Sequence, residues 1–136
     1  MGQRRRAREC ALQILFQLEF NPADPKDLIR VYWEHQRASK EIRDYGTWIV
    51  ETILAHGQAI DEAIQADSKN WRLARMAVVD RLILRLASYE LLFERDTPAS
   101  VAIDEALELA RTFSSDDAVR FVNGILDAIR RTLERA

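Results

Sequence analysis

The 136-residue sequence has few of the residues that interrupt helices or build covalent sites. Its single cysteine excludes an internal disulfide and fits a reducing compartment. Four glycines, three prolines and few β-branched residues favour helix almost throughout. No apolar run approaches the roughly 18 residues that cross a bilayer. The polar residues after the N-terminal arginines also exclude the apolar region of an export signal. We therefore expect an all-α protein in the cytoplasm.

Groups that usually perform catalysis are equally scarce. The chain has two histidines and no HExxH, CxxC or glycine-rich phosphate loop. His56 precedes a glycine late in a helical pattern, where a cationic ring would suit the helix dipole. Cys10 stands among apolar residues and reads as a small buried hydrophobe. The acidic pairs at 104–105 and 116–117 are sequence neighbours, which diverge by about 100° on a helix, so we interpret them as solvated faces or caps. We expect no catalytic centre, cofactor or metal.

Positive charge is concentrated at the start of the chain. Residues 1–8 hold four arginines and no acid, whereas the remainder has 16 basic and 22 acidic residues, a balance of −6. Guanidinium groups bind phosphate through two donors and stack on unpaired bases. At a helix N-terminus they oppose the dipole, a cost that an anionic ligand or Glu9 would relieve. The pattern indicates an RNA-binding arm, and a solvated terminus without a partner is the alternative.

Apolar residues at helical spacing predict a compact bundle of six or seven helices, without strands, in a single domain over 1–136 with its arginine arm at 1–8. Two sub-bundles sharing the central helix are an alternative organisation. The central, buried helix is expected over 72–94, where apolar residues cover most of the circumference. Five other helices are expected: one over about 3–20, a short one capped by Asp24-Pro25, one capped by Ser39, one led by Thr97-Pro98, and a last one from Ser114 or Ser115. The helix capped by Ser39 either kinks or divides at Gly57. At the start of the last helix, Ser114 and Asp117 match a capping box in outline.

Four ordered stretches then resemble one family. They are RRRARECALQILFQLEF (4–20), NWRLARMAVVDRLILRLASYELLF (70–93), TPASVAIDEALELARTF (97–113) and FVNGILDAI (121–129). Together, and at these spacings, they resemble the NusB family of transcription antitermination factors. The resemblance implies an all-α fold of two three-helix bundles that share elements.

The same resemblance implies a function. Members of this family bind a single-stranded boxA element of nascent RNA together with NusE, a small-subunit ribosomal protein. The complex helps to keep RNA polymerase elongation complexes resistant to termination, notably on ribosomal RNA operons. Position by position, the resemblance assigns Asp80 to the NusE surface. It assigns to RNA Arg4, Arg5, Arg6, Arg8, Phe16, Asp117, Arg120 and Phe121, with Phe16 and Phe121 stacking where the first and last helices meet.

The sequence departs from the family pattern at three positions. Asp104 replaces the usual asparagine and keeps a polar side chain. Ser114 replaces the usual glycine, which would be strained if that position needs a positive φ. Phe16 replaces the usual tyrosine, so it can stack on a base but lacks a hydroxyl.

We interpret the remaining motif residues as structural. Asn123-Gly124 is expected to allow close helix packing and to satisfy a backbone group. Tyr89 is expected to be a partly buried anchor and Glu90 its exposed neighbour. The tryptophans are expected in the core or at its rim. They are Trp33, Trp48 and Trp71.

Three other interpretations stay open at this stage. The chain could be a protein-interaction module that uses its acidic face and binds no RNA. It could also be the RNA-binding portion of an enzyme related to RNA cytosine methyltransferases. Finally, an apolar patch of Leu12, Leu15 and Phe16 could support a homodimer that masks the arginines, which a light-scattering mass of one chain would exclude.

Overall fold

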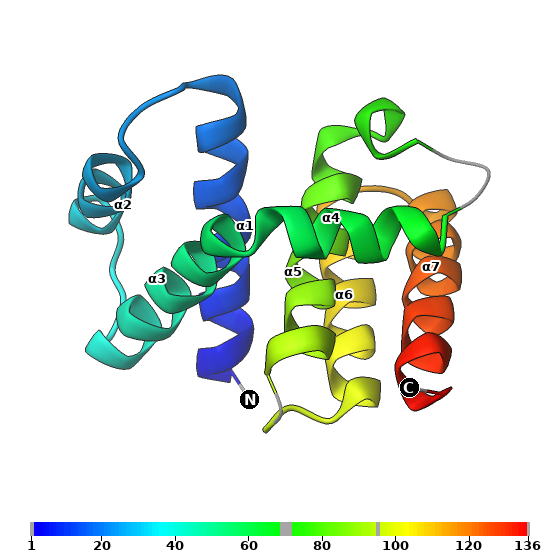
Figure 1. The fold of residues 1–136 in the computed structure, drawn as a ribbon. Helices are drawn as coiled ribbons and strands as arrows, with labels where there is room; N and C mark the ends of the chain where they lie inside the picture. The colour runs from blue at the N-terminus through cyan, green and yellow to red at the C-terminus, as the bar shows by residue number, and fades with distance from the viewer. Residues whose placement is uncertain (1, 69–71, 95, 136) are drawn as a thin grey trace. The chain divides into compact units, whose positions relative to one another are not determined.

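The computed structural model describes residues 2–68, 72–94 and 96–135, and in these ranges it is helical with no strand. The chain divides into two compact units, residues 1–54 and 55–136. Figure 1 shows the elements in chain order. The helices are α1 (Gly2–Phe20), α2 (Pro25–Glu34), α3 (Lys40–Ala55), α4 (Gly57–Ala66), the 3-10 helix η1 (Leu73–Arg75), α5 (Val78–Phe93), α6 (Ala99–Phe113) and α7 (Asp116–Arg135). None of the helices in these ranges is long and apolar enough to cross a membrane. The predicted all-α fold is confirmed.

The first unit is built from α1, α2 and α3, and its helix caps follow the sequence prediction. The Asp24 carboxylate accepts a hydrogen bond from the Lys26 amide, and Pro25 opens α2. Ser39 Oγ accepts from the Ile42 amide and so caps α3. The core of this unit includes fully buried apolar residues of α1 and α3, among them Cys10, whose predicted burial is confirmed.

The helical segment that begins after Ser39 divides into two helices at Gly57 rather than forming one kinked helix. α3 ends at Ala55, His56 takes a non-helical conformation, and α4 begins at Gly57. The His56 ring stacks on Phe93 with 4.5 Å between centroids and 28° between planes. The structure therefore decides between the two alternatives that the sequence left open.

In the second unit, α5 contacts α4, α6 and α7 (Figure 1). Leu82, Ile83, Leu84 and Leu86 point in different directions around the helix and are all buried, as the apolar pattern predicted. The predicted start of this helix was wrong, however. Residues 73–75 form η1, and Met76 and Ala77 are extended, because the chain turns before α5 begins. In that turn the Leu73 amide donates to Gln65 Oε1 of α4 at 2.9 Å.

The last helix begins next to Ser115, one of its two predicted starts, but the caps of α6 and α7 differ in part from the prediction. Pro98 is the cap residue of α6 rather than its first helical residue. The Thr97 hydroxyl does not cap the helix, because it is buried without a hydrogen bond in the described part of the chain. Ser115, not Ser114, caps α7 by accepting a hydrogen bond from the Ala118 amide at 3.1 Å. The predicted capping box from Ser114 to Asp117 is therefore wrong.

Several motif residues are placed differently from their predicted roles. Tyr89 and Glu90 are both 1% exposed, so Glu90 is not a surface neighbour. Glu105 is buried as well, and both carboxylates keep an interaction inside the protein, which offsets part of the cost of burying them. Gly124 lies on an exposed face where an added Cβ would meet no atom within 4 Å, so it does not serve close helix packing.

Of the tryptophans predicted in the core or at its rim, Trp33 is at the rim, whereas Trp48 is exposed and the prediction is wrong for it. Trp33 is partly buried, and Trp48 is more than half exposed. Trp71 lies outside the described residues.

Candidate nucleic-acid interface

The arginine arm forms the first turns of α1, so its side chains extend from a continuous helix. Arg4 and Arg5 are exposed and Arg6 is half-buried. The Arg4 guanidinium lies 4.9 Å from the centre of the Tyr45 ring, and Arg6 Nη2 donates to Gln36 Oε1 at 3.1 Å. Neither contact is an ion pair, so the positive charge of these two groups is not neutralised by them. This end of the first unit can therefore attract phosphate.

Arg8 differs from its three neighbours in the arm. It is 3% exposed and has an interaction partner inside the protein. A phosphate ligand needs its guanidinium at the surface, and a buried one with an internal partner does not meet that need. Three of the four arginines that the resemblance assigns to RNA thus lie at or near the surface.

Two aromatic rings follow on the same helix. Phe16 is 42% exposed and Phe20 is 64% exposed, and their centroids are 4.8 Å apart at an interplanar angle of 54°. Exposed rings of this kind are suited to stacking on unpaired bases. Leu12 and Leu15 are buried, so only Phe16 remains of the apolar patch considered for self-association.

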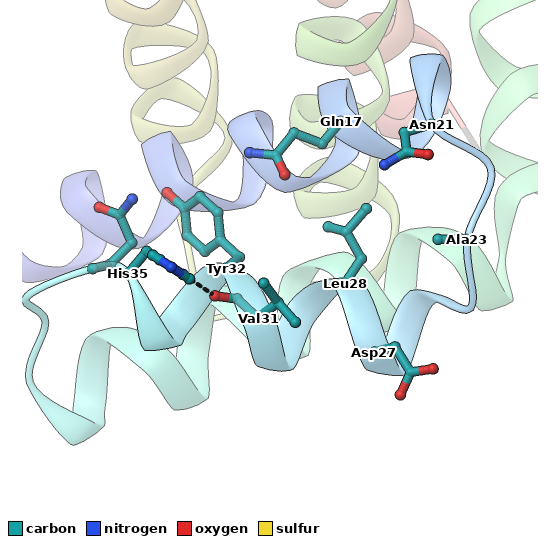
Figure 2. A pocket seen from close by; sticks show the side chains of 9 residues that line it. Gln17, Asn21, Ala23, Asp27, Leu28, Val31, Tyr32 and His35 are labelled. Carbon is teal, nitrogen blue, oxygen red and sulfur yellow. Dashed lines mark hydrogen bonds between the residues drawn. The ribbon is translucent and has the colours of Figure 1, made fainter.

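A groove of about 410 Å³ lies between α1 and α2. Figure 2 shows Gln17 of α1 and Asn21, which follows that helix, facing Leu28 and Tyr32 of α2 across it. The lining contains no Arg or Lys, and its carboxylate, Asp27, would repel phosphate. This groove therefore lacks the positive charge of the arginine arm and is not suited to bind phosphate.

Tyr32 stiffens the wall of this groove. Its hydroxyl donates to Gln13 Oε1 at 2.5 Å, and its ring packs edge-on against Trp33. Burial, and then the Cys10 thiol beside it, raise the pKa of Tyr32 well above its usual range. The phenol stays protonated and acts as a hydrogen-bond donor that joins α2 to α1.

The second unit holds the other predicted residues. A cavity of about 330 Å³ is lined by Arg75, Asp80, Asp117 and Phe121, and also by Met76, Ala77, Ser115 and Ala118. Asp80 comes from α5, and Asp117 and Phe121 come from α7, so the fold gathers residues from two separate sequence motifs. Asp80 Oδ1 accepts a 2.6 Å hydrogen bond from the Ser114 hydroxyl.

Arg120 lies on the outside of this region rather than in the cavity. Its guanidinium pairs with the Asp117 carboxylate one turn earlier, and both side chains are largely exposed. Such a surface pair contributes little to stability, so either group can exchange its partner for a ligand. Arg75 is the residue that sequence reasoning missed, and its signal was the basic position in the RLARM segment before α5.

The predicted site residues thus fall into two sets. Arg4, Arg5, Arg6, Arg8 and Phe16 lie in the first unit, and Asp80, Asp117, Arg120 and Phe121 lie in the second. The serine at position 114, where the family usually has glycine, is compatible with the fold, because φ at this residue is −131° and not positive.

The NusB family model matches residues 5–131, which is nearly the whole chain. The chain belongs to the NusB family. It is 44% identical over 134 residues to the transcription antitermination protein NusB of Geobacter sulfurreducens, covering 98% of this chain and 97% of that one. The NusB protein of Trichlorobacter lovleyi is 43% identical over 129 residues, covering 95% and 91%.

Solved NusB structures have the same fold. Thermotoga maritima NusB has 39% sequence identity and a TM-score of 0.84, covering 94% of this chain and 90% of that chain. A structure of the antitermination factors NusB and NusE in complex with double-stranded RNA gives a TM-score of 0.86 at 27% identity, covering 97% and 98%. The family resemblance seen in the four motifs is therefore confirmed along the chain.

Proposed function

We propose that this NusB-family chain is a transcription antitermination factor that binds boxA-type single-stranded RNA together with NusE. In this role it promotes processive transcription of ribosomal RNA operons and reaches the RNA polymerase elongation complex indirectly. The observation that carries the proposal is family membership along nearly the whole chain, with relatives that are named for antitermination. A similar solved structure that contains both NusE and RNA supports the choice of partners. The role places the protein in the cytoplasm, where transcripts are made.

In the first unit, Arg4, Arg5 and Arg6 bind the RNA phosphates. All three guanidinium groups are at or near the surface, and the contacts of Arg4 with a ring and of Arg6 with an amide do not neutralise their charge. Phe16 stacks on a base, with the exposed Phe20 ring beside it. Arg8 is instead a structural residue, since it is buried and already engaged.

In the second unit, Phe121, Asp117 and Arg120 supply the remaining RNA contacts. Phe121 offers ring surface in the cavity, while the exposed Asp117–Arg120 pair offers an acceptor and a donor for base edges or phosphates. Asp80 faces NusE, oriented by the hydrogen bond from Ser114. Arg75 borders the same cavity and adds positive charge to an otherwise acidic lining.

The protein works by binding and not by catalysis. His35 Nδ1 lies 3.0 Å from the Val31 carbonyl oxygen, and the His56 ring stacks on Phe93. Cys10, the one cysteine, is fully buried. Cys10 is thus inaccessible, and the two histidines make a contact with a helix carbonyl and a ring stack rather than a catalytic pair.

The test is fluorescence anisotropy with a labelled boxA RNA and a scrambled RNA, each with and without NusE. We expect tighter binding to boxA, further tightening by NusE, and loss of binding when Arg4, Arg5 and Arg6 are all changed to Ala. A protein that ignores both RNAs even in the presence of NusE would refute the RNA-binding role. The chain would then be a protein-interaction module with a NusB fold.

A further inference from the structure

A second groove of the first unit, about 640 Å³ in volume, lies between α2 and α3 and takes no part in the proposed RNA site. Its floor is Trp33, whose indole Nε1 donates to Thr47 Oγ1 at 2.9 Å. Gly46 allows this close approach, because a Cβ there would lie 3.0 Å from Trp33 Cζ2. The groove is therefore a rigid feature of the helix pair.

Trp48 forms the exposed wall of this groove and is 55% exposed. Tryptophan is strongly enriched at the energetic centres of protein interfaces. Arg30 and Glu34, which also line the groove, form an ion pair at 3.5 Å, and Asp44 pairs with Lys40 at 3.1 Å. These four charges are thus balanced within the first unit.

Two charges in the groove remain unbalanced. The side chains of Arg43 and Glu51 line it, are exposed, and make no hydrogen bond or ion pair within the described part of the chain. They are eight residues apart on α3, or about 12 Å along the helix axis, with Trp48 between them. The groove thus presents a cation, an apolar ring and an anion at successive heights along α3, with Trp48 turned about 140° around the helix from Arg43.

We propose that this groove docks a helical segment of a protein component of the elongation complex, an inference that rests on the proposed function. The segment presents an acidic side chain to Arg43, an apolar one to Trp48 and a basic one to Glu51. An amphipathic helix can lay an apolar anchor against Trp48, and the two opposite charges set the direction of the segment. RNA fits less well, because three carboxylates and two arginines line the groove.

The test compares Trp48→Ala, Arg43→Glu and Glu51→Lys in a reconstituted transcription assay with a boxA template, NusE and the cognate polymerase. Leu54→Ala and Glu41→Lys are the matched controls, since both positions are exposed on α3 outside the groove. We expect Trp48→Ala to raise the concentration needed for half-maximal readthrough roughly tenfold or more, with smaller losses for the two charge variants. Binding to boxA RNA with NusE should stay within about twofold of the unchanged protein.

The outcomes separate this inference from the proposed function. If the unchanged protein neither binds boxA nor supports readthrough, the proposed function fails and the docking role fails with it. If it does both and the three groove variants match their controls, only the docking role is overturned. If Trp48→Ala weakens boxA binding, the groove binds nucleic acid and the protein-docking role is again overturned. Thermal unfolding checks each variant, and the two charge variants decide the question if Trp48→Ala does not fold.

Discussion

The Ser114 hydroxyl donates a 2.6 Å hydrogen bond to Oδ1 of Asp80, and so ties the end of α6 to the first turn of α5. Ser114 stands where the family usually has glycine, and Asp80 is the residue assigned to NusE. The departure from the family pattern therefore acts directly on a predicted partner-binding residue. It limits the rotamers of the carboxylate and leaves its second oxygen for another donor.

Loss of this bond should be measurable by a double-mutant cycle. We expect Ser114→Ala to lower the free energy of unfolding by about 1 kcal/mol, because the hydroxyl bonds a partly buried carboxylate. Combined with Asp80→Ala, the two changes should show a coupling energy of about 0.5–1.5 kcal/mol in urea denaturation. Strictly additive effects would show that the bond contributes nothing.

Substitutions in the arginine arm should affect RNA binding at the exposed arginines and stability at the buried one. Changing Arg4, Arg5 and Arg6 to Ala should abolish boxA binding with little change in stability, whereas Arg8→Ala should lower the free energy of unfolding by roughly 1–3 kcal/mol. Three phosphate contacts also predict a slope of log K against log salt near −2.1, compared with about −2.8 for four. Anisotropy at several salt concentrations measures the slope. A stable Arg8→Ala protein with weakened RNA binding would contradict this division.

Two buried serines should respond oppositely to alanine. Ser88 is fully buried on α5, and its hydroxyl has no hydrogen bond in the part of the chain that the structure describes. Ser88→Ala should therefore raise the free energy of unfolding by about 1 kcal/mol, since it removes an unsatisfied buried donor and improves helix propensity. Ser68 Oγ donates to the Ile64 carbonyl at 2.8 Å, so Ser68→Ala should lower stability by about 0.5–1 kcal/mol. Thermal unfolding of the two variants is the measurement. Equal changes in their unfolding temperatures would refute the different roles given to Ser88 and Ser68.

Two helical glycines should also behave differently. Gly124 faces open space, so Gly124→Ala should stabilise α7 by roughly 0.5–1 kcal/mol. Gly46 lies against the Trp33 ring and the Ala7 carbonyl, so Gly46→Val should destabilise the protein by about 1–3 kcal/mol through overpacking. Chemical denaturation compares the two. A destabilised Gly124→Ala protein would mean that the exposed glycine has a packing role after all.

Tyr32 should make stability depend on alkaline pH. Because its folded-state pKa is raised, the folded protein keeps the phenol proton after the unfolded chain has lost it. Its contribution to stability is therefore fully present below the ordinary tyrosine pKa of about 10 and is lost as pH rises above that value. Tyr32→Phe should make the fall in unfolding free energy shallower by up to about 1.4 kcal/mol per pH unit in that window. Urea unfolding at a series of alkaline pH values tests this, and parallel curves would contradict it.

The sequence alone determined the helical class, the family, and most helix positions. These depend on local physics and on motif order: the 3.6-residue apolar period, the Asp24 and Ser39 caps, and four stretches at family spacing. The arm was also visible as a run of four arginines without an acid.

Only the tertiary structure decided how individual polar residues are used. Burial depends on which neighbours pack across a helix face, so the sequence could not show that Arg8 is enclosed while Arg4 is exposed, or that Glu90 is inside. The same holds for Ser114, which looked like a cap by its local spacing but bonds Asp80, a residue 34 positions earlier in the chain. Local propensity sets where a helix can begin, whereas long-range packing chooses among the available partners.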